Sequence, residues 1–498
     1  MNVNPITRLD YPDPDVIRVE DTYYMVSTTM HFMPGCEILQ SFDLVHWEHV
    51  TYVYETLDHT DAQQLKSGQN IYGQGMWAAS LRYHEGRFYI CFVANDTRKT
   101  YLYTSEKIDG PWKKQLIEGF YHDGSLLFDE DGRNYIVYGN DEIWITELNE
   151  DLTAPKKDGL HRLLVSDHKN PELGYEGSHI QKINGYYYIF LIHSQRDRWM
   201  RTEACFYSDS LEGEFTGGDV LCDDRGYCGQ GVAQGGIVDT PDGKWYAMLF
   251  QDSGAVGRIP ILLPVTWKDH FPVFGQNGHV PEEIEVHSTR PGYIYQPLVG
   301  SDDFCNGLLP RWQFNHDPDP RYYHLDALQG TYTITTREVC TELTQAVNTL
   351  TQRMSYPSCA AEVTVDASAL KEGDVAGLCA LQSCYAAVGI TKHHGKYEVL
   401  MLDKKEDGIL DMTERTVVES HQMDFRLEAD FCNMKDEARC YYRVNKGDWL
   451  PIGTVHKLYF KLDHFTGCRF GLFCYAAEET GGSACFRDFK YYDVDEIS

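Results

Sequence analysis

Three carboxylates stand at the same place in a pattern that recurs along the first half of the chain. They are Asp13, Asp123 and Glu176, each followed by Pro or Gly and then by Asp or Ser. Cleavage of a glycosidic bond needs one carboxyl that is protonated, to release the leaving oxygen, and one that is ionised, to activate water or attack the sugar. A third carboxylate nearby would raise the pKa of the acid by like-charge repulsion. An acidic residue before a strand is also a common solvated turn residue. The three carboxylates together therefore indicate a functional role more strongly than any one of them alone.

The recurring pattern reads as a strand, a tight turn and an aromatic-rich return strand. Its five copies span residues 13–24, 77–89, 123–135, 176–188 and 234–246. The turns, such as Asn184-Gly185 and Asp242-Gly243, mostly carry the chemistry of tight hairpins. Self-similarity at roughly 40–50 residues or somewhat more is typical of propeller blades. The sequence therefore predicts a five-bladed β-propeller over residues 1–285.

The first strands of all blades start around one mouth of a propeller's central channel. The three carboxylates are therefore predicted to meet there, while the two remaining copies place neutral residues at this position, near Ala78 and at Gln234.

Several motifs in this half resemble glycoside hydrolase family 43. The resemblance covers roughly residues 4–285, and the motifs that carry it follow the family's order: Tyr11-Pro12-Asp13-Pro14-Asp15-Val16, Met76-Trp77-Ala78-Ala79-Ser80, Asp123-Gly124-Ser125-Leu126, Tyr175-Glu176-Gly177-Ser178-His179 and Gly257-Arg258.

The resemblance implies a role for each acid. Asp13 would be the general base that activates water, Glu176 the general acid, and Asp123 the residue that tunes the pKa of the acid and holds it in place. The family inverts anomeric configuration, with a water between base and sugar. Trp77 would line the pocket and Arg258 would reach into it from the last blade. The alternatives are a core tryptophan and a surface ion-pair arginine.

Two positions depart from the family pattern, and both are predicted substrate contacts. Gln234 stands where the family's β-xylosidases usually have a histidine, which affects the contact beneath the sugar. Met30 replaces a phenylalanine that packs against the sugar, and methionine covers an apolar sugar face with a less rigid surface.

The second half of the chain has the pattern of antiparallel strands with polar turns. Residues 286–300 are predicted to be a linker and residues 301–498 a β-sandwich, with strict alternation clearest over 425–431. This half resembles the concanavalin-like jelly roll that follows many family 43 β-xylosidases, on segments that include Phe465-Thr466-Gly467. In such proteins a sandwich loop closes one side of the pocket. The alternative is a sandwich that only stabilises the propeller or binds sugar elsewhere.

Bulk properties narrow the partners. The 44 basic and 75 acidic residues give a net charge of −31, which argues against nucleic acid or an anionic membrane surface and is compatible with a neutral glycan. Neither an N-terminal apolar segment nor a run of ~18 apolar residues is present, so a cytoplasmic protein is expected. The histidines and cysteines form no metal-binding spacing, and we expect neither a metal nor a cofactor. A homo-oligomer of two or four copies is a family-level expectation.

Taken with the resemblance, the residues predict an exo-acting, inverting glycoside hydrolase that releases terminal β-D-xylose or α-L-arabinofuranose from plant-derived oligosaccharides. One alternative is a non-catalytic carbohydrate-binding propeller, which we would expect to have lost one of the three acids. Another is a fructan-cleaving hydrolase, a class that begins with an Asn-Asp-Pro-Asn type of motif where this chain has Pro12-Asp13-Pro14-Asp15.

Overall fold

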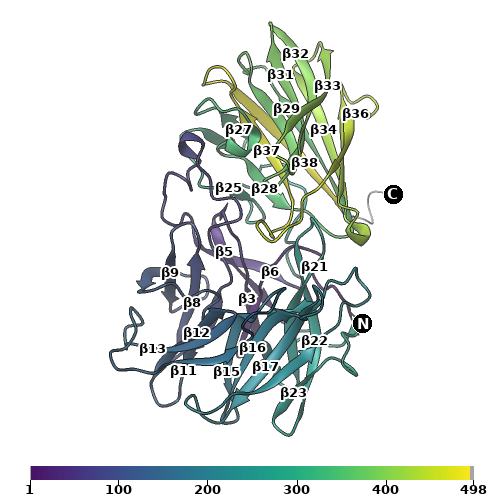
Figure 1. Ribbon diagram of the computed structural model, residues 1–498. Coiled ribbons are helices and arrows are strands. Elements are labelled where there is room, and N and C mark those ends of the chain that lie inside the picture. Colours follow the sequence, from purple (N-terminus) through teal and green to yellow (C-terminus); the bar gives the residue numbers. More distant parts are fainter. Residues whose placement is uncertain (1, 494–498) are drawn as a thin grey trace.

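A computed structural model describes residues 2–493 as two all-β domains, a propeller and a sandwich, stacked one above the other (Figure 1). Helical structure in the described residues is limited to short 3-10 turns at Lys66–Gly68, Leu343–Gln345 and Cys432–Met434. None of the helices in residues 2–493 has the length and apolar character needed to cross a membrane.

The propeller consists of five antiparallel sheets, which are its blades. Blade I contains β2 (Asp15–Val19), β3 (Thr22–Val26), β5 (Gly35–Ser41) and β6 (Glu48–Tyr54). Blade II contains β7 (Ser80–His84), β8 (Arg87–Ala94), β9 (Lys99–Ser105) and β10 (Lys113–Ile117). Blade III contains β11 (Ser125–Phe128), β12 (Asn134–Asn140), β13 (Glu142–Leu148) and β14 (His161–Ser166). Blade IV contains β15 (Glu176–Ile183), β16 (Tyr186–Ser194), β17 (Arg201–Ser208) and β18 (Thr216–Leu221). Blade V contains β19 (Val232–Ala233), β20 (Ile237–Asp239), β21 (Trp245–Asp252), β22 (Arg258–Lys268) and β23 (Phe271–Phe274).

Each recurring sequence pattern forms the first hairpin of one blade, so the prediction of a five-bladed propeller is confirmed. The turn between β15 and β16 shows the local cause. Asn184 has φ 51° and Gly185 has φ 86°, and positive φ at both central residues is the type I′ geometry that matches the twist of the flanking strands. Neighbouring blades pack through apolar faces, as where Ile38 of blade I meets Leu81 and Ile90 of blade II in one buried cluster.

The start of the chain closes the ring against blade V. Strand β1 (Asn2–Val3) pairs with β24 (Glu283–Ile284), which follows the last blade. The buried Asn4 side chain then donates to the Leu262 carbonyl at 2.7 Å and accepts from the Leu262 N–H at 3.1 Å. These bonds link the first segment to β22 and fix the position of Asp13, which follows shortly after.

The second domain is a sandwich of two antiparallel sheets, which confirms the predicted architecture. One sheet contains β33 (Leu410–Val418), β32 (Lys396–Lys404), β31 (Tyr385–His393), β30 (Val375–Leu381), β37 (Arg469–Tyr475), β28 (Leu350–Arg353), β25 (Gln313–Asn315) and β4 (Phe32–Met33), in this spatial order. The other contains β26 (Tyr323–Asp326), β27 (Thr331–Thr335), β38 (Ser483–Asp493), β29 (Ser358–Asp366), β34 (Gln422–Asp430), β35 (Glu437–Arg443) and β36 (Leu450–Lys457). Inward side chains such as Phe425 and Leu427 alternate with outward ones along β34, as the sequence predicted.

The two domains are joined by shared structure rather than by loose contact. Strand β4 belongs to the blade I segment, yet it pairs with β25 of the sandwich, with Met33 opposite Phe314. A buried ion pair at 2.9 Å joins Glu37 of β5 to Arg353 of β28. Ala255 and Val256, before β22, belong to the same buried apolar cluster as the sandwich core. The sandwich is therefore held in a fixed position over one mouth of the propeller.

Three neutral histidines lie buried where the domains meet. His31 of blade I lies with its ring centroid 4.7 Å from that of His316 and 5.4 Å from that of His464, both from the sandwich. Burial lowers the pKa of His316 to about 3, that of His464 to about 4, and that of His31 well below its usual value. The Ile71 N–H donates to His316 Nε2 at 3.0 Å, so this nitrogen must stay unprotonated.

We expect this cluster to make the fold less stable as the pH falls below about 6.5, the ordinary histidine pKa. Between that pH and about 4 the unfolded chain binds protons that the folded chain cannot, so each ring lowers the free energy of unfolding by about 1.4 kcal/mol per pH unit. His316→Gln, which keeps an acceptor for Ile71, should make the dependence shallower by one proton in urea unfolding between these pH values. His287→Gln, at a side chain 67% exposed, is the control. An unchanged slope in the His316 variant would contradict the assignment.

Candidate active site

Asp13, Asp123 and Glu176 stand where the first strands of blades I, III and IV begin. Asp13 and Asp123 lie just before β2 and β11, and Glu176 is the first residue of β15. Asp13 has φ 52° and Asp123 φ 47°, and Gln234 has φ 60° at the matching place in blade V. Asp13, Asp123 and Gln234 thus share a left-handed conformation, which Asp tolerates better than most residues. The structure brings the three carboxylates together, since the charges of Glu176 and Asp13 both act on Asp123.

Asp13 is buried and held at both carboxylate oxygens. Arg258 Nη1 donates to Oδ1 at 2.6 Å, and Thr28 Oγ1 donates to Oδ2 at 2.5 Å. Arg258 is held in turn by Asp252, 3.2 Å away, which also pairs with the buried Arg201 at 2.7 Å. This chain of charges fixes the orientation of Asp13.

Asp123 and Glu176 share an imidazole. The Gly177 N–H donates to Asp123 Oδ2 at 3.0 Å, and Asn140 Nδ2 donates to Glu176 Oε2 at 2.8 Å. His122 Nε2 lies 3.5 Å from each of these two oxygens.

The pKa values of this group are displaced in different directions. Burial, with the charges of Glu176 and Asp13, raises the pKa of Asp123 to about 6. Burial lowers the pKa of His122, but Asp123 and Glu176 outweigh it and raise that pKa to about 9. Burial raises the pKa of Glu176, but the hydrogen bond and charge of His122 outweigh it and lower that pKa. Titratable groups with separated pKa values in one cluster are the arrangement that acid-base catalysis uses.

Aromatic side chains from both domains border the carboxylates. Phe465, in the sandwich loop between β36 and β37, has its ring centroid 5.2 Å from that of Trp77. The Arg258 guanidinium carbon lies 3.8 Å from the Phe465 ring centroid and 4.5 Å from that of Phe250. Trp77 is half-buried. Sugars present apolar C–H faces to such rings and hydroxyls to charged groups, so this border suits a sugar.

Met30 and Gln234, the two other predicted substrate contacts, are both buried. Met30 has no exposed surface, and its sulfur accepts from Thr466 Oγ1 at 3.2 Å. Gln234 is 3% exposed, and its side chain packs against Gly177, where a Cβ would meet Gln234 at 2.7 Å. Both are about as buried as Asp13 and Arg258, and contact of either side chain with a sugar stays a prediction.

Two residues at the site were not singled out from the sequence. His122 directly precedes Asp123, but a lone histidine in a turn carries no signal of its own. Phe465 lies in a segment noted only for its resemblance to a sandwich domain, and its contact with Trp77 favours a sandwich that shapes the pocket over one that only stabilises the propeller.

His122, Asp123 and Glu176 place one nitrogen and two oxygens within 4.8 Å of one another. The imidazole Nε2 lies 3.5 Å from an oxygen of each carboxylate, and Asn140 and Gly177 already donate to those oxygens. We therefore assign this cluster to proton chemistry.

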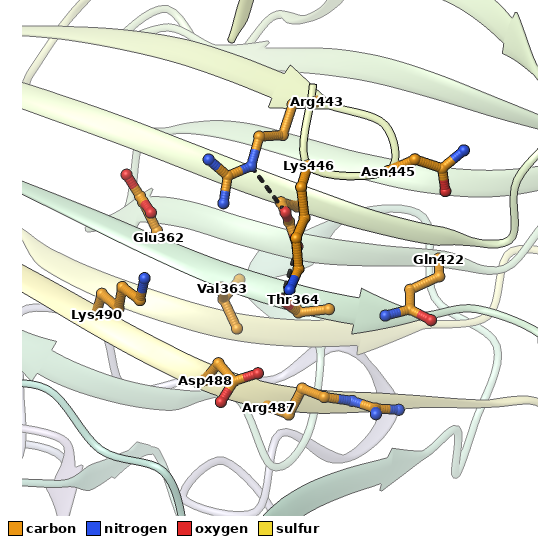
Figure 2. A pocket seen from close by; sticks show the side chains of 11 residues that line it. Glu362, Val363, Thr364, Gln422, Arg443, Asn445, Lys446, Arg487, Asp488 and Lys490 are labelled. Atoms are coloured by element: carbon orange, nitrogen blue, oxygen red, sulfur yellow. Dashed lines mark hydrogen bonds and ion pairs between the residues drawn. The ribbon is translucent and has the colours of Figure 1, made fainter. Parts of the chain in front are cut away.

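A cavity of about 650 Å³ lies on the sandwich, away from the three carboxylates. Figure 2 shows the side chains that line it. Some of its charged groups are paired, as where Arg443 donates to Asp424 at 2.8 Å. None of the described residues that line it is aromatic. Without a ring on which a sugar can lie, it is the weaker candidate for a sugar site.

A five-bladed propeller with three carboxylates at one mouth and an aromatic border defines a glycoside hydrolase. Residues 3–272 match the sequence model of glycosyl hydrolases family 43, and residues 301–492 match that of the β-xylosidase C-terminal concanavalin A-like domain. The chain belongs to glycoside hydrolase family 43.

Comparison with individual relatives shows which kind of family 43 hydrolase this chain resembles. A β-xylosidase of Formosa agariphila is 27% identical over 99% of this chain and 89% of its own length. A non-reducing end α-L-arabinofuranosidase of Bacteroides ovatus is 24% identical over 82% of this chain and 79% of its own. A solved structure described as a bifunctional GH43-CE of Bacteroides eggerthii is 42% identical, with a TM-score of 0.92, over 99% of this chain. This chain spans 64% of that longer protein. The chain is thus a hydrolase of the family's β-xylosidase and arabinofuranosidase kind.

Removing the Phe465 ring is expected to weaken substrate use while the propeller stays folded. Burial of a phenylalanine side chain is worth about 1.5–3 kcal/mol, so kcat/KM of Phe465→Ala on an aryl glycoside should fall about tenfold to a hundredfold. Leu462→Ala, in the same loop at a side chain 48% exposed, should change nothing. Equal kinetics in both variants would show that the loop does not border the occupied pocket.

Proposed function

We propose that the chain is an exo-acting, inverting hydrolase that releases a terminal β-D-xylose or α-L-arabinofuranose from short plant-derived oligosaccharides. In this proposal Asp13 is the general base, Glu176 the general acid, and Asp123 the group that tunes and holds the acid. The observation that carries it is the meeting of these three carboxylates at the propeller mouth, with Phe465 of the sandwich across from Trp77.

The reaction would proceed by one displacement. Asp13 removes a proton from water as the water oxygen bonds to the anomeric carbon. Glu176 gives a proton to the leaving oxygen as the C–O bond breaks. Arg258, held between Asp13 and Asp252, keeps the base in place and offers a charged donor at the pocket. Phe465 and Trp77 restrict one side, and a restricted pocket favours a chain end over the middle of a polymer.

The names of the relatives support both sugars and do not choose between them. Initial rates on para-nitrophenyl β-D-xyloside and para-nitrophenyl α-L-arabinofuranoside would measure the preference. An oligosaccharide labelled at its reducing end would test exo action, because exo cleavage shortens the labelled chain by one sugar at a time. Early appearance of short labelled fragments would contradict exo action. Binding of the oligosaccharide without hydrolysis would favour a carbohydrate-binding propeller instead.

A further inference from the structure

His122 occupies a position that hydrogen bonding alone does not account for. Its Nε2 lies 3.5 Å from Asp123 Oδ2 and 3.5 Å from Glu176 Oε2, too far for a strong bond to either. This nitrogen is buried and has no closer partner among the described residues. On its other side is the edge of Trp77, with ring centroids 6.2 Å apart. One imidazole N–H therefore faces two carboxylates that the proposed reaction uses.

The charges around His122 allow one proton to reside either on His122 or on Glu176. The charged groups that face it are Asp123 and Glu176, with Asp13 further off, while Arg201 and Arg258 act on Glu176 from blades IV and V. With the proton on His122, Glu176 is ionised; with the proton on Glu176, His122 is neutral. Both states have the same net charge and differ by one transfer between neighbouring atoms. Groups coupled this closely titrate as a unit.

We propose that His122 stores, between turnovers, the proton that Glu176 delivers to the leaving oxygen. The inference rests on the proposed function and adds to it a positioning residue that acts through the acid. In the step, the proton leaves His122 Nε2, whose electron pair stays on the imidazole, and bonds to Glu176 Oε2. Glu176 passes it to the leaving oxygen while Asp13 takes one proton from the attacking water. After the sugar leaves, Asp13 releases its proton to solvent, and the cluster takes one from solvent.

This arrangement resolves a conflict at the site. A general acid must hold a proton at the working pH, yet the pKa of Glu176 is lowered. Because the last proton of the cluster is held with a pKa of about 9, at His122, the cluster can supply it well above neutral pH. Without the imidazole, only the carboxylates could hold that proton, and carboxyl groups ordinarily release it at a lower pH than an imidazole with a pKa of about 9.

The test is the pH dependence of kcat/KM for xylobiose in His122→Gln and His122→Phe. Wild type should keep its activity to about pH 9, whereas both variants should begin to lose about tenfold per pH unit at a lower pH than wild type. With a dinitrophenyl xyloside, whose leaving group needs no acid, the variants should retain nearly full activity at every pH. His193→Gln is the matched control, since His193 also lies between two carboxylates, 3.1 Å from Asp167 and 2.8 Å from Asp219, in β16. It should behave as wild type.

Each result decides the proposal. A high-pH limit that is unchanged in the His122 variants overturns it, and so does a loss that is equal at every pH and on both substrates, which would indicate a purely structural role. Loss of wild-type activity in EDTA, restored by a divalent cation, overturns it too. If neither variant folds, NMR of histidine labelled at Cε1 must show one imidazole that stays protonated above neutral pH and whose titration moves down in Glu176→Gln. The absence of such a resonance overturns the proposal. Wild type that cleaves no glycoside would instead overturn the proposed function itself.

Discussion

Asp13→Asn is expected to lower kcat by roughly 10²-fold to 10⁴-fold, the usual contribution of a general base. The loss should be the same on a natural oligosaccharide and on an activated aryl glycoside, because both need the same activated water. Asparagine matches the size of the side chain and keeps an oxygen for the Arg258 N–H, now 2.6 Å from Asp13. The variant removes the negative charge and the proton-accepting oxygen while the pocket keeps its shape.

A loss of kcat identifies the role of Asp13 only if the variant is folded. Arg258 is buried, and in the variant it loses one of its two carboxylate partners. Asp252, 3.2 Å away, remains, so thermal unfolding should show a modest loss of stability. Asp21→Asn is the control from the same blade, since the Asp21 side chain is 46% exposed and pairs with Arg290 at 2.9 Å, away from the mouth. If a folded Asp13→Asn enzyme kept activity within tenfold of wild type, Asp13 would not be the general base.

Glu176→Gln is expected to separate substrates by their leaving groups. On xylo-oligosaccharides, whose leaving alkoxide needs a proton, kcat/KM should fall roughly 10²-fold to 10⁴-fold. On a dinitrophenyl glycoside the loss should be small, because that leaving group departs without a proton. Glutamine retains the oxygen to which Asn140 donates at 2.8 Å, so the change is one of acidity rather than of position.

The ratio of the two losses is the decisive quantity for Glu176. An equal loss on both substrates would assign Glu176 to binding or to folding and would leave the acid unidentified. The effect of Asp123→Asn should lie between these cases, since it acts on the acid through its charge and its contact with His122.

The propeller could be predicted because its information is local and repeated. Each blade begins with a hairpin whose turn residues, such as Asn184-Gly185, determine the geometry by themselves. Five copies of that signal give the blade number, and symmetry then places Asp13, Asp123 and Glu176 at one mouth. The alternation along β34 similarly identified a half-buried strand of the sandwich.

What could not be predicted depends on contacts between distant segments. Strand β4 has only two residues and pairs with β25 of the other domain, and so short a segment has no periodicity to detect. Phe465 reaches Trp77 from nearly four hundred positions further along the chain, and no local pattern encodes this contact. The Met30 sulfur accepts a hydrogen bond from Thr466 of the same sandwich loop, another contact that no local pattern indicates.

The most direct test of the central claim is the configuration of the first sugar released, followed by proton NMR during hydrolysis of an aryl β-D-xyloside. If Asp13 and Glu176 act from opposite sides of the ring, with a water beside the base, the α anomer of xylose must appear first and the β anomer only later, by mutarotation. Initial release of the β anomer would mean that a carboxylate attacks the sugar itself, and it would contradict the roles assigned here to both acids.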